Sequence, residues 1–213
     1  MTHANHRRGS RESLDKDYVI LVRGDVKGNP EGAQKVMEIF AANEPVGLIR
    51  RRTGVPLRYM KNWKEGYSIK ELLENPDPAI YLAATYDDTK KVEGVVRDLK
   101  EAELGLCVVV SGVFENTFDI CTKVGTGPHT ANLSMETIGR TELLPEDRIL
   151  ELMTMCGHGL VGAPLARHLI DRVRKGKITA EEAGCELGKQ CVCNFFNPVR
   201  GAKIIEEYVK TQR

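Results

Sequence analysis

The sequence has no long apolar run and no excess of one charge, and each absence excludes a class of protein. No segment offers the roughly 18 uninterrupted apolar residues that a membrane-spanning helix needs. The 31 basic and 30 acidic residues give a net charge of +1, so electrostatics offers no case for nucleic acid as the main partner. We therefore expect neither a membrane protein nor a protein that depends on nucleic acid.

An export signal is also missing from the sequence. Residues 1–17 are polar and charged, without the apolar stretch of a signal peptide. We expect residues 1–16 to be a disordered arm or an expression remnant outside the fold. We also expect a cytoplasmic protein, where cysteines are more often buried, catalytic or metal-binding than paired as disulfides.

The first two thirds of the chain predict an α+β domain over residues 17–140. The order strand, helix, strand occurs twice, which favours a ferredoxin-like (split β-α-β) sandwich with both helices on one face of an antiparallel sheet. A short doubly wound parallel sheet is the alternative. Residues 55–67 look irregular, and residues 131–138 alternate weakly enough to add an edge strand. The predicted strands span residues 18–22, 46–49, 79–85 and 106–110, and the predicted helices residues 31–42, 68–73 and 87–102.

Residues 141–213 read as a helical, cysteine-rich region that carries the functional site. Four of the six cysteines fall between residues 156 and 193. The helical pattern covers residues 145–154, 163–175, 180–189 and 197–210. We therefore expect this region to hold a cofactor on a helical scaffold.

The first candidate site is the run Cys156-Gly157-His158-Gly159, which lies between two predicted helices. Two glycines let the backbone bend sharply and approach a ligand closely. Free backbone N–H groups at such a turn lower the pKa of a thiol and favour the thiolate. The alternative is a helix end at Gly157 with a buried, inert Cys156.

Residues 155–159 resemble the short motif around one catalytic cysteine in the proline racemase and hydroxyproline epimerase family. In that family two cysteines move a proton on and off the α-carbon of the substrate. The second cysteine of those enzymes lies in a glycine-rich stretch, whereas residues 125–130 here contain no cysteine. We interpret the resemblance as a shared local arrangement of residues and not as membership of that family.

The second candidate site is the pair Cys191-Val192-Cys193 at the end of a predicted helix. This spacing differs from redox dithiols and from structural zinc sites, which use two or more intervening residues. A Cys-x-Cys pair joined by Cys156 suits a 4Fe–4S cluster with three protein ligands and one open iron. The alternative is two unremarkable thiols at a helix end.

The remaining cysteines are weaker candidates. Cys185 lies inside a predicted helix, where it is either a fourth ligand or, as we favour, a buried core residue. Cys107 lies in an apolar strand and is expected in the core, and Cys121 remains open.

Among the histidines, His158 lies in the Cys156 motif, so we expect it to be an acid–base group or to support the site. His129 lies in a Gly/Pro loop whose backbone amides could hold an anion, although a simple turn also explains that loop. Arg50, Arg51 and Arg52, with the nearby Trp63, could bind a phosphate, a carboxylate or RNA, but a solvated strand end is the commoner meaning of such a run.

The sequence thus predicts an intracellular iron–sulfur enzyme that acts on an anionic small molecule by Lewis-acid chemistry such as elimination, hydration or sulfur removal. Cys156, Cys191 and Cys193 would be the ligands, and His158 and His129 the catalytic candidates. One alternative is a metal-free enzyme in which Cys156 is base or nucleophile and His158 its partner. Another is a non-enzymatic metal or redox sensor, or an RNA-binding module. A homo-oligomer remains open.

Overall fold

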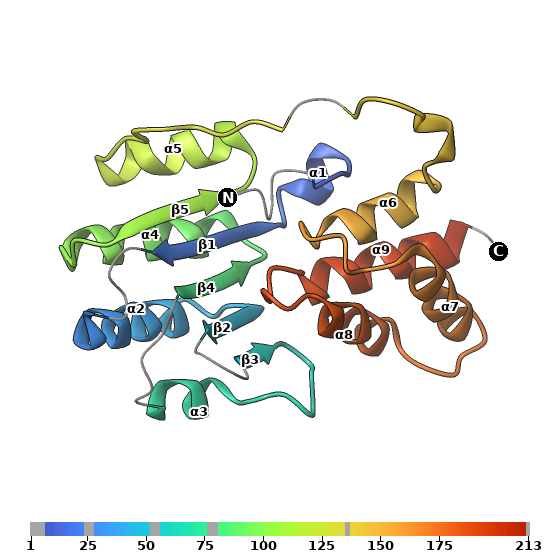
Figure 1. Ribbon diagram of the computed structural model, residues 1–213, viewed down its shortest axis with the longest axis horizontal. Helices are drawn as coiled ribbons and strands as arrows, with labels where there is room; N and C mark the ends of the chain where they lie inside the picture. Colours follow the sequence, from blue (N-terminus) through green and yellow to red (C-terminus); the bar gives the residue numbers. More distant parts are fainter. Residues whose placement is uncertain (1–6, 24–27, 52–55, 76–80, 135–136, 212–213) are drawn as a thin grey trace.

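The computed structural model describes residues 7–23, 28–51, 56–75, 81–134 and 137–211 (Figure 1). Within these ranges the protein is a mixed α+β structure, with a five-stranded antiparallel sheet followed by helices. The strands are β1 (Tyr18–Arg23), β2 (Gly47–Arg51), β3 (Leu57–Met60), β4 (Tyr81–Tyr86) and β5 (Cys107–Ser111). The helices are α1 (Arg11–Leu14), α2 (Pro30–Ala42), α3 (Ile69–Glu74), α4 (Thr89–Glu101), α5 (Phe114–Val124), the 3-10 helix η1 (Thr141–Leu143), α6 (Asp147–Thr154), α7 (Ala163–Arg174), α8 (Ala180–Gln190) and α9 (Pro198–Thr211).

The sheet has the strand order β3-β2-β4-β1-β5, and every neighbouring pair is antiparallel. In the centre, Ile20 of β1 lies opposite Ala84 of β4 on one side and Val110 of β5 on the other. The four strands predicted from the sequence all belong to this sheet, and residues 79–80 of the third lie outside the described residues. The parallel alternative is therefore wrong.

Both faces of the sheet are covered, which explains why its central strands are almost wholly apolar. Ile20 and Val22 of β1 share a core with α2 and α4, whose buried side chains include Val36 and Val92. Alternate residues of the same strand, such as Val19, point into a second core formed with α6–α9. A strand buried on both faces reads as a continuous apolar run and not as an alternating one. Figure 1 shows α6–α9 grouped at one end of the molecule, away from α2–α5.

Local signals in the sequence account for several helix boundaries. Ser68 begins α3 and Thr179 begins α8, each with a capping box in which the residue three positions on is a glutamate. Asn29 caps α2 and Pro30 occupies its first turn, where the missing N–H of proline has no cost. These starts match the expectations from the sequence.

Strand β3 differs from the expectation of an irregular segment at residues 55–67. Leu57 and Met60 are buried, whereas Arg58 and Tyr59 between them are half-buried. This pattern has no period of two, so it carried no strand signal. Pairing with β2 forms the strand: Leu57 lies opposite Arg50 and Met60 opposite Gly47.

The predicted edge strand at residues 131–138 is also absent from its described part. Residues 131–134 and 137–138 form no strand and are exposed, and residues 135–136 lie outside the described residues. Leu133 and Ile138 are 74% and 86% exposed, so the weak alternation did not correspond to a buried face.

The N-terminal arm differs from the expected disordered segment outside the fold. Residues 1–6 lie outside the described residues, but residues 7–16 contact the helical part. The backbone N–H of Arg8 donates to Thr154 Oγ1 at 3.0 Å, and Ser13 Oγ donates to Glu151 at 2.6 Å. Arg200 donates in turn to the carbonyl of Arg8 at 2.6 Å. Hydropathy gave no sign of this packing because polar contacts hold the arm.

The basic run at the end of β2 is not solvated at its first residue. Arg50 is 2% exposed and donates to Gln34 Oε1 of α2 at 3.0 Å. It is buried because β2 lies between β3 and β4 inside the sheet. The side chain of Arg51, and all of Arg52, lie outside the described residues.

Among the described residues, no helix is both long enough and apolar enough to cross a membrane.

Candidate functional site

The loop after α6 presents Cys156. Helix α6 ends at Thr154, and the chain then turns so that the N–H of Gly159 donates to the carbonyl of Cys156 at 2.9 Å. Gly159 has φ +66°, a left-handed conformation that glycine adopts without strain. In this turn the backbone N–H groups of His158 and Leu160 point at the Cys156 sulfur.

The loop after α8 presents Cys191 in a similar way. Cys191 ends the helix, and Asn194 reverses the chain in the left-handed region at φ +56°. The N–H of Asn194 donates to the carbonyl of Cys191 at 2.9 Å. The N–H groups of Phe195 and Phe196 then face the Cys191 sulfur. Each of the two sulfurs therefore lies against two backbone donors.

The two loops bring Cys156 and Cys191 together. Their side chains share a hydrogen bond, and the residues are only 2% and 1% exposed. The thiol of Cys191 donates to Cys156 and, with the backbone N–H groups, lowers the pKa of Cys156 from 9.0 to about 5. The same contact, together with burial, raises the pKa of Cys191. The two pKa values shift in opposite directions because one thiol donates and the other accepts in the shared hydrogen bond.

Cys193 and His158 form a second pair beside the first. Cys193 Sγ lies 3.3 Å from His158 Nδ1, and Cys193 is 8% exposed. His158 itself is exposed, so this pair faces the surface while Cys156 and Cys191 lie below it. The three predicted ligand cysteines and His158 thus occupy adjoining loops. In the described part of the chain, no three His, Cys, Asp or Glu side chains are arranged as a metal centre.

The sheet holds the Cys191 loop from below. Asn194 Nδ2 donates to the carbonyls of Leu48 in β2 at 3.2 Å and Tyr59 in β3 at 2.8 Å. Thr85 of β4 donates its hydroxyl to the carbonyl of Asn194 at 3.2 Å. Asparagine adopts the left-handed region more readily than most residues, and here its amide also bonds to two strands of the sheet. No local sequence pattern predicts these contacts, because they join segments more than 100 residues apart.

The basic and aromatic segment of the sequence also supports this loop. Arg58 donates to the carbonyl of Cys191 at 3.2 Å and to that of Lys189 at 3.3 Å, the last carbonyls of α8. Its guanidinium lies 5.5 Å from the centre of the Trp63 ring. A cation at the C-terminus of a helix is favourable for the helix dipole. Only the fold brings residues 58 and 191 together.

The other cysteines lie away from the pair. Cys185 Sγ donates to the carbonyl of Lys61 at 3.4 Å, and burial raises its pKa to about 11. It is buried, as we favoured from the sequence. Cys107 is exposed and not in the core, because β5 is an edge strand. Cys121 is buried, and burial raises its pKa.

His129 is not joined to the cysteine loops. It is exposed after α5 and lines a groove of about 740 Å³ along β5, whose lining includes neither Cys156 nor His158.

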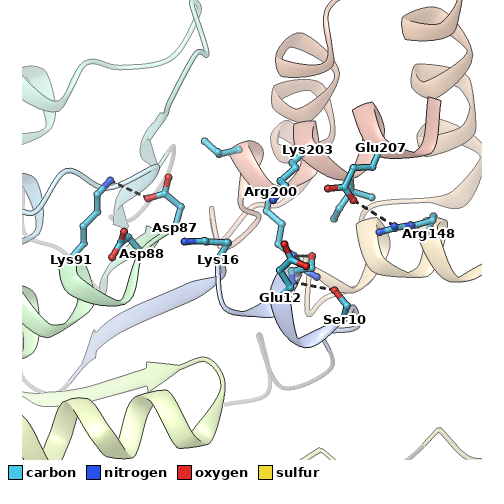
Figure 2. Close-up of a pocket in the computed structure, with 13 residues that line it drawn as sticks. Ser10, Glu12, Lys16, Asp87, Asp88, Lys91, Arg148, Arg200, Lys203 and Glu207 are labelled. Carbon is cyan, nitrogen blue, oxygen red and sulfur yellow. Dashed lines mark hydrogen bonds and ion pairs between the residues drawn. The ribbon is translucent and has the colours of Figure 1, made fainter. Parts of the chain in front are cut away.

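A further cavity of about 460 Å³ lies where α1, the start of α4 and the face of α9 meet (Figure 2). Charged side chains of both signs line it. Lys91 pairs with Asp87 at 3.0 Å, and Arg148 pairs with Glu207 at 3.5 Å. None of the residues predicted for the site lines this cavity. The sequence did not reveal it because its walls come from distant segments.

Comparison with protein-family models, with curated proteins and with solved structures gives no match. A functional conclusion must therefore come from the geometry of the site.

Proposed function

We propose that Cys156, Cys191 and Cys193 bind a 4Fe–4S cluster and that the protein is an iron–sulfur enzyme. One observation supports this proposal above the others. Cys156 and Cys191 are buried, their thiols interact with one another, and each sulfur also interacts with two backbone N–H groups. Amide donors stabilise thiolates, and thiolates are the ligands of iron–sulfur clusters.

Two adjacent thiolates repel each other unless a positive charge lies between them. A single proton has that role in the present pair, since one sulfur donates and the other accepts. A metal centre can replace the proton, because soft cations bind thiolates strongly and release the protons of the ligands. The site therefore has the electrostatic character of a metal site.

Cluster binding requires a local movement. Each thiolate of a cluster binds a different iron, so Cys156 and Cys191 must move apart from their direct contact. Cys193 lies on the surface side of the pair, where it would be the third ligand. Three ligands leave one iron open, as catalytic metal sites keep a free position.

The open position would face His158, which is exposed beside Cys193. A cluster with an open iron supplies a Lewis acid for an anionic small molecule, through elimination, hydration or sulfur removal. His158 would then move a proton at the substrate. Because His129 lines a separate groove, we assign it no role at this site.

A metal-free cysteine enzyme is the second candidate, supported by the low pKa of Cys156. Here Cys156 would be the base or nucleophile, with Cys191 and not His158 as its hydrogen-bond partner. Because both residues are buried, a substrate, like a cluster, would reach Cys156 only after the two loops moved.

The strand order supports a ferredoxin-like interpretation of the sheet. Strands β1, β2, β4 and β5 with helices α2 and α4 would form the β-α-β-β-α-β core. Strand β3 would be an added edge strand. The six free thiols also support an intracellular location.

Serine substitutions under anaerobic reconstitution test the proposal. Cys156→Ser, Cys191→Ser and Cys193→Ser should each lose bound iron, because each removes a thiolate. Cys185→Ser is the matched control and should keep the iron, since its sulfur bonds to Lys61 instead. Equal loss of iron in all four variants would contradict this ligand set. If neither the parent nor any variant binds iron, the metal-free enzyme is favoured.

A further inference from the structure

Arg7 of the N-terminal arm lies between the two cysteine loops. Its Nη2 donates to the carbonyl of Met155 at 3.4 Å and also to the carbonyl of Phe195. Met155 directly precedes Cys156, and Phe195 lies in the loop that surrounds Cys191. The Arg7 side chain is 6% exposed. One buried guanidinium therefore contacts both loops.

The contact with Phe195 reaches the Cys191 sulfur through a single peptide unit. The carbonyl of Phe195 and the N–H of Phe196 belong to the same planar group, and that N–H faces Cys191. A donor on the carbonyl fixes the orientation of the plane and polarises the N–H at its other end. Arg7 thus acts on the sulfur without touching it.

Arg7 is itself held in place by a buried ion-pair network. It pairs with Asp17, whose side chain is fully buried. Asp17 is bound on its other side by Arg200 at 2.6 Å, and Arg200 also pairs with Glu151 at 2.9 Å. The Asp17 carboxylate lies between the two guanidinium groups, so the Arg7 charge is compensated and its direction is fixed.

We infer that Arg7 is a positioning residue of the cysteine site, which holds the Cys156 and Cys191 loops at a set separation. An effect of Arg7 on metal binding rests on the proposed function. The positioning of the two loops by Arg7 does not depend on that function. Lysine cannot replace arginine here, because only the planar guanidinium has donors that reach two carbonyls and a carboxylate together.

Thiol labelling of the metal-free full-length chain tests the inference. Arg7→Ala should raise the alkylation rates of Cys156 and Cys191 roughly tenfold or more, the effect of losing a charge-assisted hydrogen bond on local opening. Arg7→Lys should also raise both rates. Arg8→Ala is the matched control, since the Arg8 side chain contacts Thr137 and neither cysteine loop. Peptide mass spectrometry measures the alkylation of each cysteine separately, and Cys185 is the internal reference.

Added ethylguanidinium should restore slow labelling of Arg7→Ala, and ethylammonium should not. A general loss of fold would raise Cys185 labelling as well and would not be rescued. Unchanged Cys156 and Cys191 rates in Arg7→Ala, or an equal rise in Arg8→Ala, would overturn the inference. If the parent protein binds no iron, the proposed function fails, but the labelling comparison still tests the role of Arg7.

Discussion

At the scale of single residues, the environment of each cysteine separates the site from the rest of the thiols. Cys156 and Cys191 face backbone donors and each other, whereas Cys185 faces one carbonyl. The Cys191 thiol and backbone donors stabilise the Cys156 thiolate, whereas burial disfavours the Cys185 thiolate. The same residue type therefore has opposite pKa shifts at positions 156 and 185.

Cys185 gives a prediction about stability at high pH. Its pKa is raised to about 11 in the folded chain from 9.0, so above pH 9 the unfolded chain loses this proton first. The proton stabilises the folded state below pH 9, and this stability is lost as the pH rises towards 11. The urea midpoint of Cys185→Ser should therefore fall less between pH 8 and pH 10.5 than that of the parent. Equal falls in the two proteins would contradict the assignment, since the raised pKa values of the tyrosines act alike in both.

At the scale of helices and strands, the sequence predicted the elements with a clear local signal. The strands β1 and β4 and the starts of helices α3 and α8 were predicted because their signals are local. Strand β3 was missed because its pairing with β2 and not its own pattern makes it a strand. The weak alternation near Leu133 predicted an edge strand that is not formed by the described residues, because no second layer covers them.

Helix α8 gives a prediction at this scale, since its end presents Cys191. Thr179 Oγ1 accepts from the N–H of Glu182 at 3.1 Å, and Glu182 accepts from the N–H of Thr179 at 2.9 Å. Thr179→Ala should lower the free energy of unfolding by about 1 kcal/mol. Thr179→Ser keeps a capping hydroxyl and should therefore retain most of this stabilisation. Urea unfolding measures both. The same loss in the serine variant would show that the cap is not the cause.

At the scale of the whole molecule, the candidate site depends on contacts between distant segments. The sequence indicated that Cys156, Cys191 and Cys193 would meet, because residue type and spacing suit a shared centre. It gave no indication that Arg58, Asn194 and Arg7 would hold the two loops. These contacts join the arm, the sheet and the helical part, and no local pattern records which polar residues will meet across a fold.

The buried network around Arg200 gives a prediction for the whole fold. Arg200 is 3% exposed and bonds to Asp17, Glu151, Ser13 and the carbonyl of Arg8. Arg200→Leu would leave buried carboxylates short of a partner and should cost about 3 kcal/mol of unfolding free energy. Lys203→Ala, on an exposed position of the same helix, should cost no more than about 0.5 kcal/mol. Similar losses in both variants, measured by urea unfolding, would contradict this role of the network.

The most direct test of the central claim is the iron and sulfide content of the full chain, purified and reconstituted without oxygen. A three-cysteine site predicts about four iron and four sulfide per chain, both lost on exposure to air because one iron is open. The variant with serine at positions 156, 191 and 193 sets the background. Iron and sulfide no higher than that background, or one zinc ion without sulfide, would contradict the claim that these cysteines bind an iron–sulfur cluster.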